Sequence, residues 1–165
     1  MNSESPLNGK SILVVDDEPD ILDAISELLD MCEIHTAGDY DSALNILLNY
    51  TFDIVILDIM GVNGFKLLEK SALRGFDTIM LTAHAVTAEA LKKSIKLGAV
   101  AFLPKDNINE IEEVIGDIVL GTDKQLWWRK NLGKESRYFD DKFGQGWKEK
   151  DVFFKEFEKS IQDKK

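Results

Sequence analysis

Cysteine is almost absent from this sequence, since Cys32 is the single thiol among 165 residues. One thiol excludes an intramolecular disulfide and a zinc site built on cysteine pairs, and it fits a reducing compartment. We expect Cys32 to be a plain buried thiol near the end of a helix. The chain also lacks an apolar run of about 18 to 20 residues, so we expect no membrane span. Because the N-terminus has no apolar stretch typical of a secretion signal, we predict a cytoplasmic protein.

Positive charge is scarce as well. Lys and Arg number 20 against 30 Asp and Glu, which gives a formal net charge of −10. Nonspecific nucleic-acid binding needs Lys and Arg to neutralise phosphates, so we expect no direct nucleic-acid partner. Residues 1–120 hold 8 basic and 21 acidic side chains, whereas residues 121–165 hold 12 and 9. Together with the apolar pattern, this divides the chain into a tail (1–9), a main domain (10–121) and a C-terminal extension (122–165).

The main domain alternates short apolar runs with longer segments whose apolar positions recur every three or four residues, the pattern of alternating strands and helices. We predict strands at residues 11–15, 33–37, 52–57, 78–81 and 100–103, and helices at residues 19–29, 40–49, 65–72, 85–97 and 107–120. Pro19 is suited to a first helical position, and Gly98 to the end of the fourth helix. Five strands, each followed by a helix, predict an α/β fold with a doubly wound, five-stranded parallel sheet.

Polar side chains follow four of these strands: Asp16 and Asp17, then Asp58, Thr82 and Lys105. In such a sheet the ligand crevice lies outside the carboxyl ends of the strands. Three converging carboxylates suit Mg²⁺ or Mn²⁺ rather than zinc, and a hydroxyl with an ammonium suits a phosphoryl group. Alone, the first two acids are better explained as helix caps. The matching strand ends favour a joint cation and phosphoryl site.

The segments LVVDDE, ILDIM, MLTAH and FLPKD resemble, in this order, the receiver domain of bacterial two-component response regulators. The resemblance covers most of residues 10–120 and implies a flavodoxin-like receiver fold. It implies that Asp58 is the phosphoacceptor and that Asp16 and Asp17 bind Mg²⁺ with it. Lys105 would contact the phosphoryl oxygens and act with Asp58 in catalysis.

Three further positions take their implied roles from the same resemblance. Thr82 would be the switch hydroxyl, and Phe102 would be the switch aromatic, although a core phenylalanine explains Phe102 equally well. Met60 would offer its backbone carbonyl to the metal. Met60 and His84 also occupy the variable positions that, in the family, influence the lifetime of the phosphoryl group.

The implied function is that of a response regulator in a two-component phosphorelay. Asp58 would accept a phosphoryl group from a histidine kinase or a phosphotransfer protein, and a protein-interaction face at residues 85–120 would switch toward an unknown downstream protein. Such a chain is a signalling receiver, not an enzyme, although it assists transfer to its own aspartate. The alternative is a receiver-like adaptor that is little phosphorylated and binds partners through its extension. Hydrolases with an aspartate nucleophile are disfavoured, because they place a second Asp where Met60 stands.

The sequence departs from the family pattern after Asp58. The loop that follows is about two residues shorter than usual and lacks the usual proline, so we expect Gly61 and Gly64 to make the turn. The shortening bears on the placement of the Met60 carbonyl. Asp106 also stands where many members have proline.

The extension holds nine of the 15 aromatic residues of the chain. Residues 126–128 would either extend the fifth helix or pack back on the main domain, and residues 147–162 have the pattern of an amphipathic helix. Three readings remain open: a segment docked on the main domain, a partner-binding or homodimerising element, and a helix at a membrane surface. We find no helix-turn-helix pattern, and so expect no direct transcriptional output.

Overall fold

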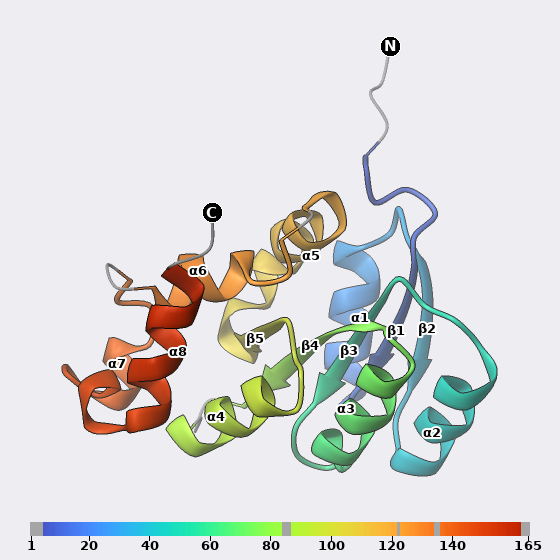
Figure 1. Ribbon diagram of the computed structural model, residues 1–165. Helices are drawn as coiled ribbons and strands as arrows, with labels where there is room; N and C mark the ends of the chain where they lie inside the picture. Colours follow the sequence, from blue (N-terminus) through green and yellow to red (C-terminus); the bar gives the residue numbers. More distant parts are fainter. Residues whose placement is uncertain (1–4, 84–86, 122, 134–135, 163–165) are drawn as a thin grey trace.

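Five parallel strands form one sheet in the computed structural model, which describes residues 5–83, 87–121, 123–133 and 136–162. The strands are β1 (Ser11–Val15), β2 (Glu33–Ala37), β3 (Ile54–Asp58), β4 (Asp77–Thr82) and β5 (Ala101–Pro104), in the spatial order β2-β1-β3-β4-β5. This is the doubly wound, five-stranded parallel sheet that the sequence predicts (Figure 1). Strand boundaries differ from the predicted ones by two residues at most, and Asp58 is the last residue of β3 rather than the first after it.

Helices cover both faces of the sheet. They are α1 (Pro19–Leu28), α2 (Tyr40–Asn49), α3 (Gly64–Leu73), α4 (Ala88–Lys96) and α5 (Ile111–Leu120). The helices α1 and α5 lie against one face, and α2, α3 and α4 lie against the other (Figure 1). This winding leaves the carboxyl ends of β1 and β3 at one edge, where the predicted site residues lie.

Local signals explain several helix ends. Pro19 occupies the first turn of α1, and the Asp39 side chain accepts a hydrogen bond from the Ser42 backbone N–H at the start of α2. Thr87 caps α4 in the same way, by accepting from the Ala90 N–H. Gly98 follows α4 with φ +102°, a conformation that favours glycine, and thereby ends the helix as predicted.

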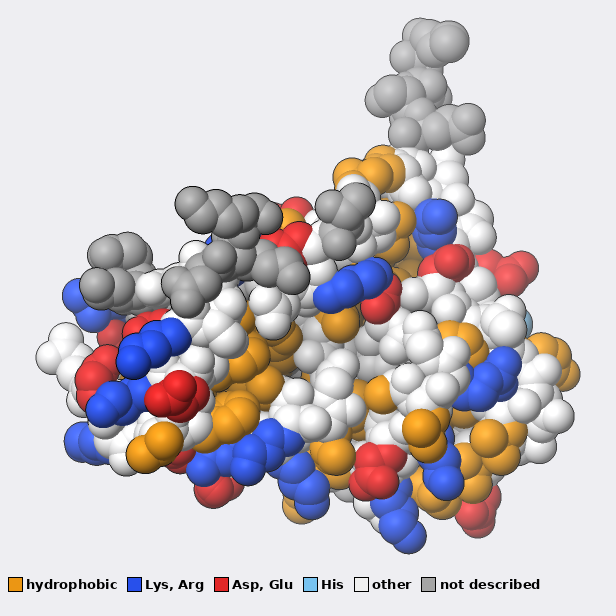
Figure 2. All heavy atoms as spheres, in the orientation of Figure 1, with side chains coloured by type: hydrophobic (Ala, Val, Ile, Leu, Met, Phe, Trp, Pro, Cys, Tyr) orange, Lys and Arg blue, Asp and Glu red, His pale blue; other side chains and the backbone are white. Residues whose placement is uncertain are grey.

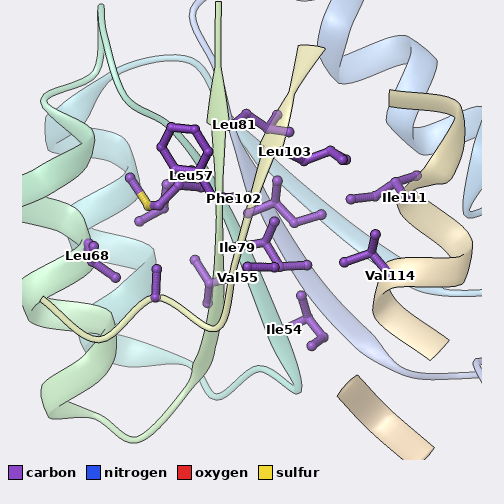
Figure 3. Close-up of a cluster of buried hydrophobic side chains, with 14 of the residues drawn as sticks. Ile54, Val55, Leu57, Leu68, Ile79, Leu81, Phe102, Leu103, Ile111 and Val114 are labelled. Atoms are coloured by element: carbon purple, nitrogen blue, oxygen red, sulfur yellow. The ribbon is translucent and has the colours of Figure 1, made fainter. Parts of the chain in front are cut away.

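The core lies between the sheet and both helical layers (Figure 3). The strand β3 is buried along its whole length, as expected for a central parallel strand that is apolar on both faces. Leu68 of α3 packs on one side of the sheet, and Ile111 and Val114 of α5 pack on the other. The site at the sheet edge therefore rests on a rigid support.

For two of the predicted helices, the N-terminal part of the prediction was wrong. Residues 105–110 form a 3₁₀ helix, η1 (Lys105–Glu110), and α5 begins only at Ile111, because Asn107 has non-helical angles (φ −107°, ψ 23°). Likewise, the predicted helix over residues 147–162 is a short 3₁₀ turn, η2 (Lys148–Lys150), followed by α8 (Val152–Gln162). The predicted fourth helix begins at Ala88, and its residues 85–86 lie outside the described residues.

The extension folds into α6 (Leu126–Leu132), α7 (Asp140–Phe143), η2 and α8. Its helices lie beside α4, β5 and α5 (Figure 1), and hydrophobic side chains gather between the extension and the rest of the molecule (Figure 2). The buried Trp128 Nε1–H donates to the Ala99 carbonyl at 3.1 Å, and the Phe139 and Phe102 ring centroids are 5.9 Å apart. Of the three interpretations of the extension, the structure therefore agrees with a segment docked on the main domain. Residues 126–128 pack back on that domain and do not extend α5.

The cysteine lies just after α1 and is half-buried rather than fully buried. Its Sγ donates to the Leu7 carbonyl at 3.4 Å, and burial raises the pKa of the Cys32 thiol. Both features are those of a structural thiol. Among the helices of the described residues, none has the length and apolar character that a membrane crossing requires.

Candidate functional site

Three carboxylates meet at the carboxyl edge of the sheet. Asp16 follows β1 directly, and Asp58 ends the neighbouring strand β3. One oxygen from each of Asp16, Asp17 and Asp58 lies within 4.8 Å of the other two. Asp16 is fully buried, Asp58 is 3% exposed and Asp17 faces solvent, so the cluster opens outward on one side. The parallel register brings together acids that lie about 40 residues apart in the sequence, as the sequence predicts.

Lys105 lies among these acids. It follows β5, and its Nζ lies 2.9 Å from Asp16 Oδ2, 3.3 Å from Asp58 Oδ1 and 2.6 Å from Glu18 Oε1. Only 13% of its side chain is exposed. The ammonium thus partly offsets the negative charge of the cluster, and it lies where it could contact any anion bound to Asp58.

Burial and mutual repulsion shift the pKa values of the site. The pKa of Asp58 is raised to about 6, first by burial and then by the charge of Asp16, against the opposing effect of Lys105. Burial also raises the pKa of Asp16. Burial alone would lower the pKa of Lys105, but its hydrogen bonds to Glu18 and Asp16 outweigh that effect and raise it. The site therefore holds more negative charge than one lysine can neutralise.

Glu18 was missed as a site residue by sequence reasoning. Its carboxylate makes the shortest of the three contacts to Lys105, and its backbone N–H donates to Asp16 Oδ1 at 2.9 Å. A signal was present, since Glu18 completes the LVVDDE segment directly after the two acids. Only the position of Lys105, which comes 87 residues later, reveals the contact.

The other predicted site residues lie near this cluster. Thr82 ends β4, is buried, and comes directly after Leu81, the residue that pairs with Asp58. Its Oγ1 donates to the Ala83 carbonyl at a long 3.5 Å, so the hydroxyl is weakly held. Phe102 is fully buried in β5. The Met60 side chain is 71% exposed, and the proposed role of its carbonyl remains a prediction. His84 lies outside the described residues.

The short loop after Asp58 is closed by glycine, as predicted. Gly61 has φ +81°, and a Cβ there would collide with the Asp17 carboxylate. At Gly64 the constraint is close approach rather than an unusual φ, because a Cβ would collide with the Asp58 backbone carbonyl. The Gly64 N–H donates to the Ile59 carbonyl at 3.1 Å and closes the turn. The loop thus packs tightly around Asp58, the predicted phosphoacceptor.

We predict that Gly64→Ala lowers the free energy of unfolding by about 2 kcal/mol or more, because the backbone around Asp58 must shift to admit the methyl group. Chemical denaturation of both proteins measures the difference. Gly116→Ala is the matched control, since Gly116 lies inside α5 and a Cβ there would have open space. This control should be stabilised by roughly 0.5–1 kcal/mol. Equal stability of Gly64→Ala and the parent chain would contradict the close approach.

The acidic cluster fits a magnesium ion. Carboxylate oxygens are hard ligands of the kind that Mg²⁺ and Mn²⁺ prefer. Asp16 Oδ2 is buried and, apart from its ion pair with Lys105, has no hydrogen-bond partner within the described residues, so it retains lone pairs for a cation. Burial raises the pKa of both Asp16 and Asp58, and the charge of Asp16 adds to the rise at Asp58. A divalent cation bound here would favour the ionised form of both carboxyls.

The strand order and the acid-and-lysine site at the carboxyl edge define an α/β domain of the CheY-like receiver class. Residues 12–116 match the model of the response regulator receiver domain family, and the chain belongs to this family. Receiver domains of this family are switches in phosphorelay signalling rather than classical enzymes.

Similar proteins come from plants as well as bacteria. Two-component response regulator ORR24 of Oryza sativa subsp. indica is 35% identical over 144 residues, which cover 83% of this chain and 22% of that protein. Regulator of RpoS of Escherichia coli K12 is 35% identical over 118 residues, which cover 67% of this chain and 35% of that protein. The chain therefore spans only about a fifth to a third of the length of these two relatives. The sequence alone predicted a bacterial protein, but the similar proteins include plant ones, so a bacterial origin is not shown.

Solved structures give the same family. The CheY-like receiver domain protein from Methanospirillum hungatei JF-1 is 28% identical, with a TM-score of 0.57, and the match covers 67% of this chain and 96% of that one. NtrX from Brucella abortus is 29% identical with a TM-score of 0.58, and the match covers 67% of this chain and 27% of that one.

Proposed function

We propose that this chain is a phosphorylated response regulator in which Asp58 accepts a phosphoryl group from a histidine kinase or a phosphotransfer protein. The observation that carries the proposal is the meeting of Asp16, Asp17, Asp58 and Lys105 at one edge of the sheet. Three acids alone would suit a cation, and a lysine alone would suit an anion. Their combination suits a cation and a phosphoryl group together.

Asp58 is the nucleophile of the proposed reaction. One of its oxygens forms a bond to phosphorus while the phosphorus–nitrogen bond of the donor phosphohistidine breaks, and the imidazole keeps the electron pair of that bond. The pKa of about 6 leaves most Asp58 side chains ionised at neutral pH, so no separate base is needed. The surrounding side chains would position the reactants and stabilise charge, which supply most of the catalysis in phosphoryl transfer.

Asp16, Asp17 and Asp58 would hold Mg²⁺, with the Met60 carbonyl as a further ligand. When bound, the cation neutralises charge on the transferring oxygens. Lys105 lies 3.3 Å from Asp58 Oδ1 and would contact the phosphoryl oxygens. Thr82 would turn its weakly held hydroxyl toward the same group, and Phe102 would respond as the switch aromatic.

The adaptor reading has less support. An adaptor that binds partners constitutively through its extension would display aromatic side chains on the surface. Here five of them are buried: Trp127, Trp128, Phe139, Trp147 and Phe154. The homodimer was suggested only by the aromatic side chains of the extension, and because these pack on the main domain, a homodimer is not part of the proposal. A cytoplasmic location and the absence of a nucleic-acid partner stay predictions.

Mg²⁺ should be required for phosphorylation. We expect intact-protein mass spectrometry to detect one added phosphoryl group after incubation with acetyl phosphate and Mg²⁺. Excess EDTA should reduce the rate at least about tenfold, because Lys105 is then the one cation of the proposed site left to offset the negative charge of the acids and of the transferring oxygens. Asp17→Asn is the informative variant, since Asp17 is exposed and its loss should raise the Mg²⁺ requirement without unfolding the chain. Equal labelling with EDTA would exclude the metal from the reaction.

A further inference from the structure

We propose that the C-terminal extension is a clasp on the face formed by α4, β5 and α5, and that phosphorylation of Asp58 loosens it. This inference rests on the proposed function and extends it to the regulation of the same site. The extension here means the described residues 123–133 and 136–162.

The clasp contacts several elements of the receiver domain. On α4, Lys92 Nζ lies 2.7 Å from Asp151 Oδ2, and the Lys92 and Lys96 ammonium groups lie 5.9 and 5.3 Å from the Phe153 ring centroid. On α5, Lys130 Nζ lies 2.9 Å from Asp117 Oδ2. These contacts hold the extension to α4 and to α5. A further set holds it to β5 and to the residues just before and after that strand.

The central contacts all fall on one short segment, residues 99–107. Trp128 donates to the Ala99 carbonyl before β5 begins, and Phe139 packs edge-on against Phe102 within β5. After β5, Asn107 Nδ2 donates to Tyr138 Oη at 3.0 Å. The same segment carries Lys105 into the acidic cluster. The clasp and the phosphoacceptor site therefore contact the same piece of chain, with clasp contacts on both sides of Lys105.

The present position of Lys105 belongs to the unphosphorylated site, since its Nζ pairs with the bare carboxylates of Asp16 and Asp58. A phosphoryl group on Asp58 places new oxygens beside this ammonium, and Lys105 shifts from its present pairing with Asp16 and Glu18 toward them. Lys105 begins η1, so its movement is passed to Asn107 two residues later, where the backbone is already non-helical. The hydrogen bond to Tyr138 is the first contact of the clasp to be strained.

Loosening the clasp would uncover apolar surface on both sides of the interface. Trp127, Trp128 and Phe139 are buried in the docked state. A contiguous apolar patch of this kind marks a protein-interaction site. The output of phosphorylation is therefore an aromatic surface for another protein, which is created by release rather than displayed at all times.

Reciprocity supplies a quantitative test. If a phosphoryl group on Asp58 lowers the docking equilibrium constant of the extension by some factor, then undocking must raise the affinity of the site for the phosphoryl group, or for its mimic, by the same factor. Tyr138→Phe removes the hydroxyl that accepts from Asn107 and keeps the ring. This variant should bind beryllofluoride, a stable phosphoryl mimic, about two- to tenfold more tightly in the presence of Mg²⁺. Tyr50→Phe is the matched control, because Tyr50 is exposed after α2 and should leave the affinity unchanged.

The direct experiment is hydrogen exchange of the full chain, read by mass spectrometry, with and without Mg²⁺ and beryllofluoride. We expect amide exchange in α6 and α8 to speed up by a similar two- to tenfold factor when beryllofluoride binds, with no change in Asp58→Asn. Separate labelling with acetyl phosphate reports on the proposed function itself.

The outcomes separate the two claims. Labelling of Asp58 together with unchanged or slower exchange in the extension would overturn the clasp and leave the proposed function standing. Unchanged beryllofluoride affinity of Tyr138→Phe would have the same meaning. Failure of both acetyl phosphate labelling and beryllofluoride binding would overturn the proposed function and the clasp with it.

Discussion

Replacing Asp58 by Asn should abolish the incorporation of a phosphoryl group from acetyl phosphate while leaving the chain folded. The amide is close to the carboxylate in shape but is not a nucleophile toward phosphorus, so we expect loss of labelling to background. The fold should tolerate the change, because Asp58 lies 97% buried among other acids and its charge is disfavoured there. Intact-protein mass spectrometry measures the labelling, and thermal unfolding confirms that the variant is folded.

Asp23→Asn is the control for this experiment. Asp23 is an exposed aspartate in α1, outside the acidic cluster, and its variant should be labelled like the parent chain. Labelling of Asp58→Asn at the parental rate would mean that another residue accepts the phosphoryl group. The role proposed for the acidic cluster would then be lost.

Replacing Trp128 by Ala should lower the free energy of unfolding by about 3–5 kcal/mol, the range found when a buried large aromatic side chain is truncated. Trp128 is 3% exposed, its indole N–H donates to the Ala99 carbonyl, and its ring packs edge-on against Trp127 and Phe157. Its truncation removes packing between the extension and the receiver domain and leaves the Ala99 carbonyl without its donor. Such a loss is a large share of the stability of a typical domain.

Chemical denaturation followed by far-ultraviolet circular dichroism measures this effect. Val152→Ala, which is also in the extension but 74% exposed, should change the free energy of unfolding by no more than about 0.5 kcal/mol. If Trp128→Ala were as stable as this control, the extension would not be docked in solution. The clasp would then have no physical basis.

The sequence was sufficient to predict the parallel sheet and the acidic and basic side chains at its carboxyl edge. Strands of a parallel sheet are buried on both faces, so Ile54 to Leu57 appears as an unbroken apolar run, and the residue that ends it must lie at the carboxyl edge. The same reasoning places Asp16 and Lys105. Because these predictions depend on periodicity and on strand direction, they need no knowledge of side-chain contacts.

The features that sequence reasoning did not predict are those that depend on contacts distant in the chain. The pairing of Glu18 with Lys105 spans 87 residues, and the hydrogen bond from Trp128 to Ala99 spans 29. The amphipathic pattern of the extension indicates that it must cover an apolar surface, but the pattern does not say which one. Likewise, the non-helical Asn107 inside η1 has no distinct local signal.

The central claim is that Asp58 carries the phosphoryl group, and chemical trapping tests it most directly. The chain would be incubated with acetyl phosphate and Mg²⁺, reduced with borohydride, digested and mapped by tandem mass spectrometry, since borohydride converts an aspartyl phosphate into homoserine. We predict homoserine at position 58 and at no other aspartate. Homoserine at another position, or stable labelling without any at position 58, would contradict the account.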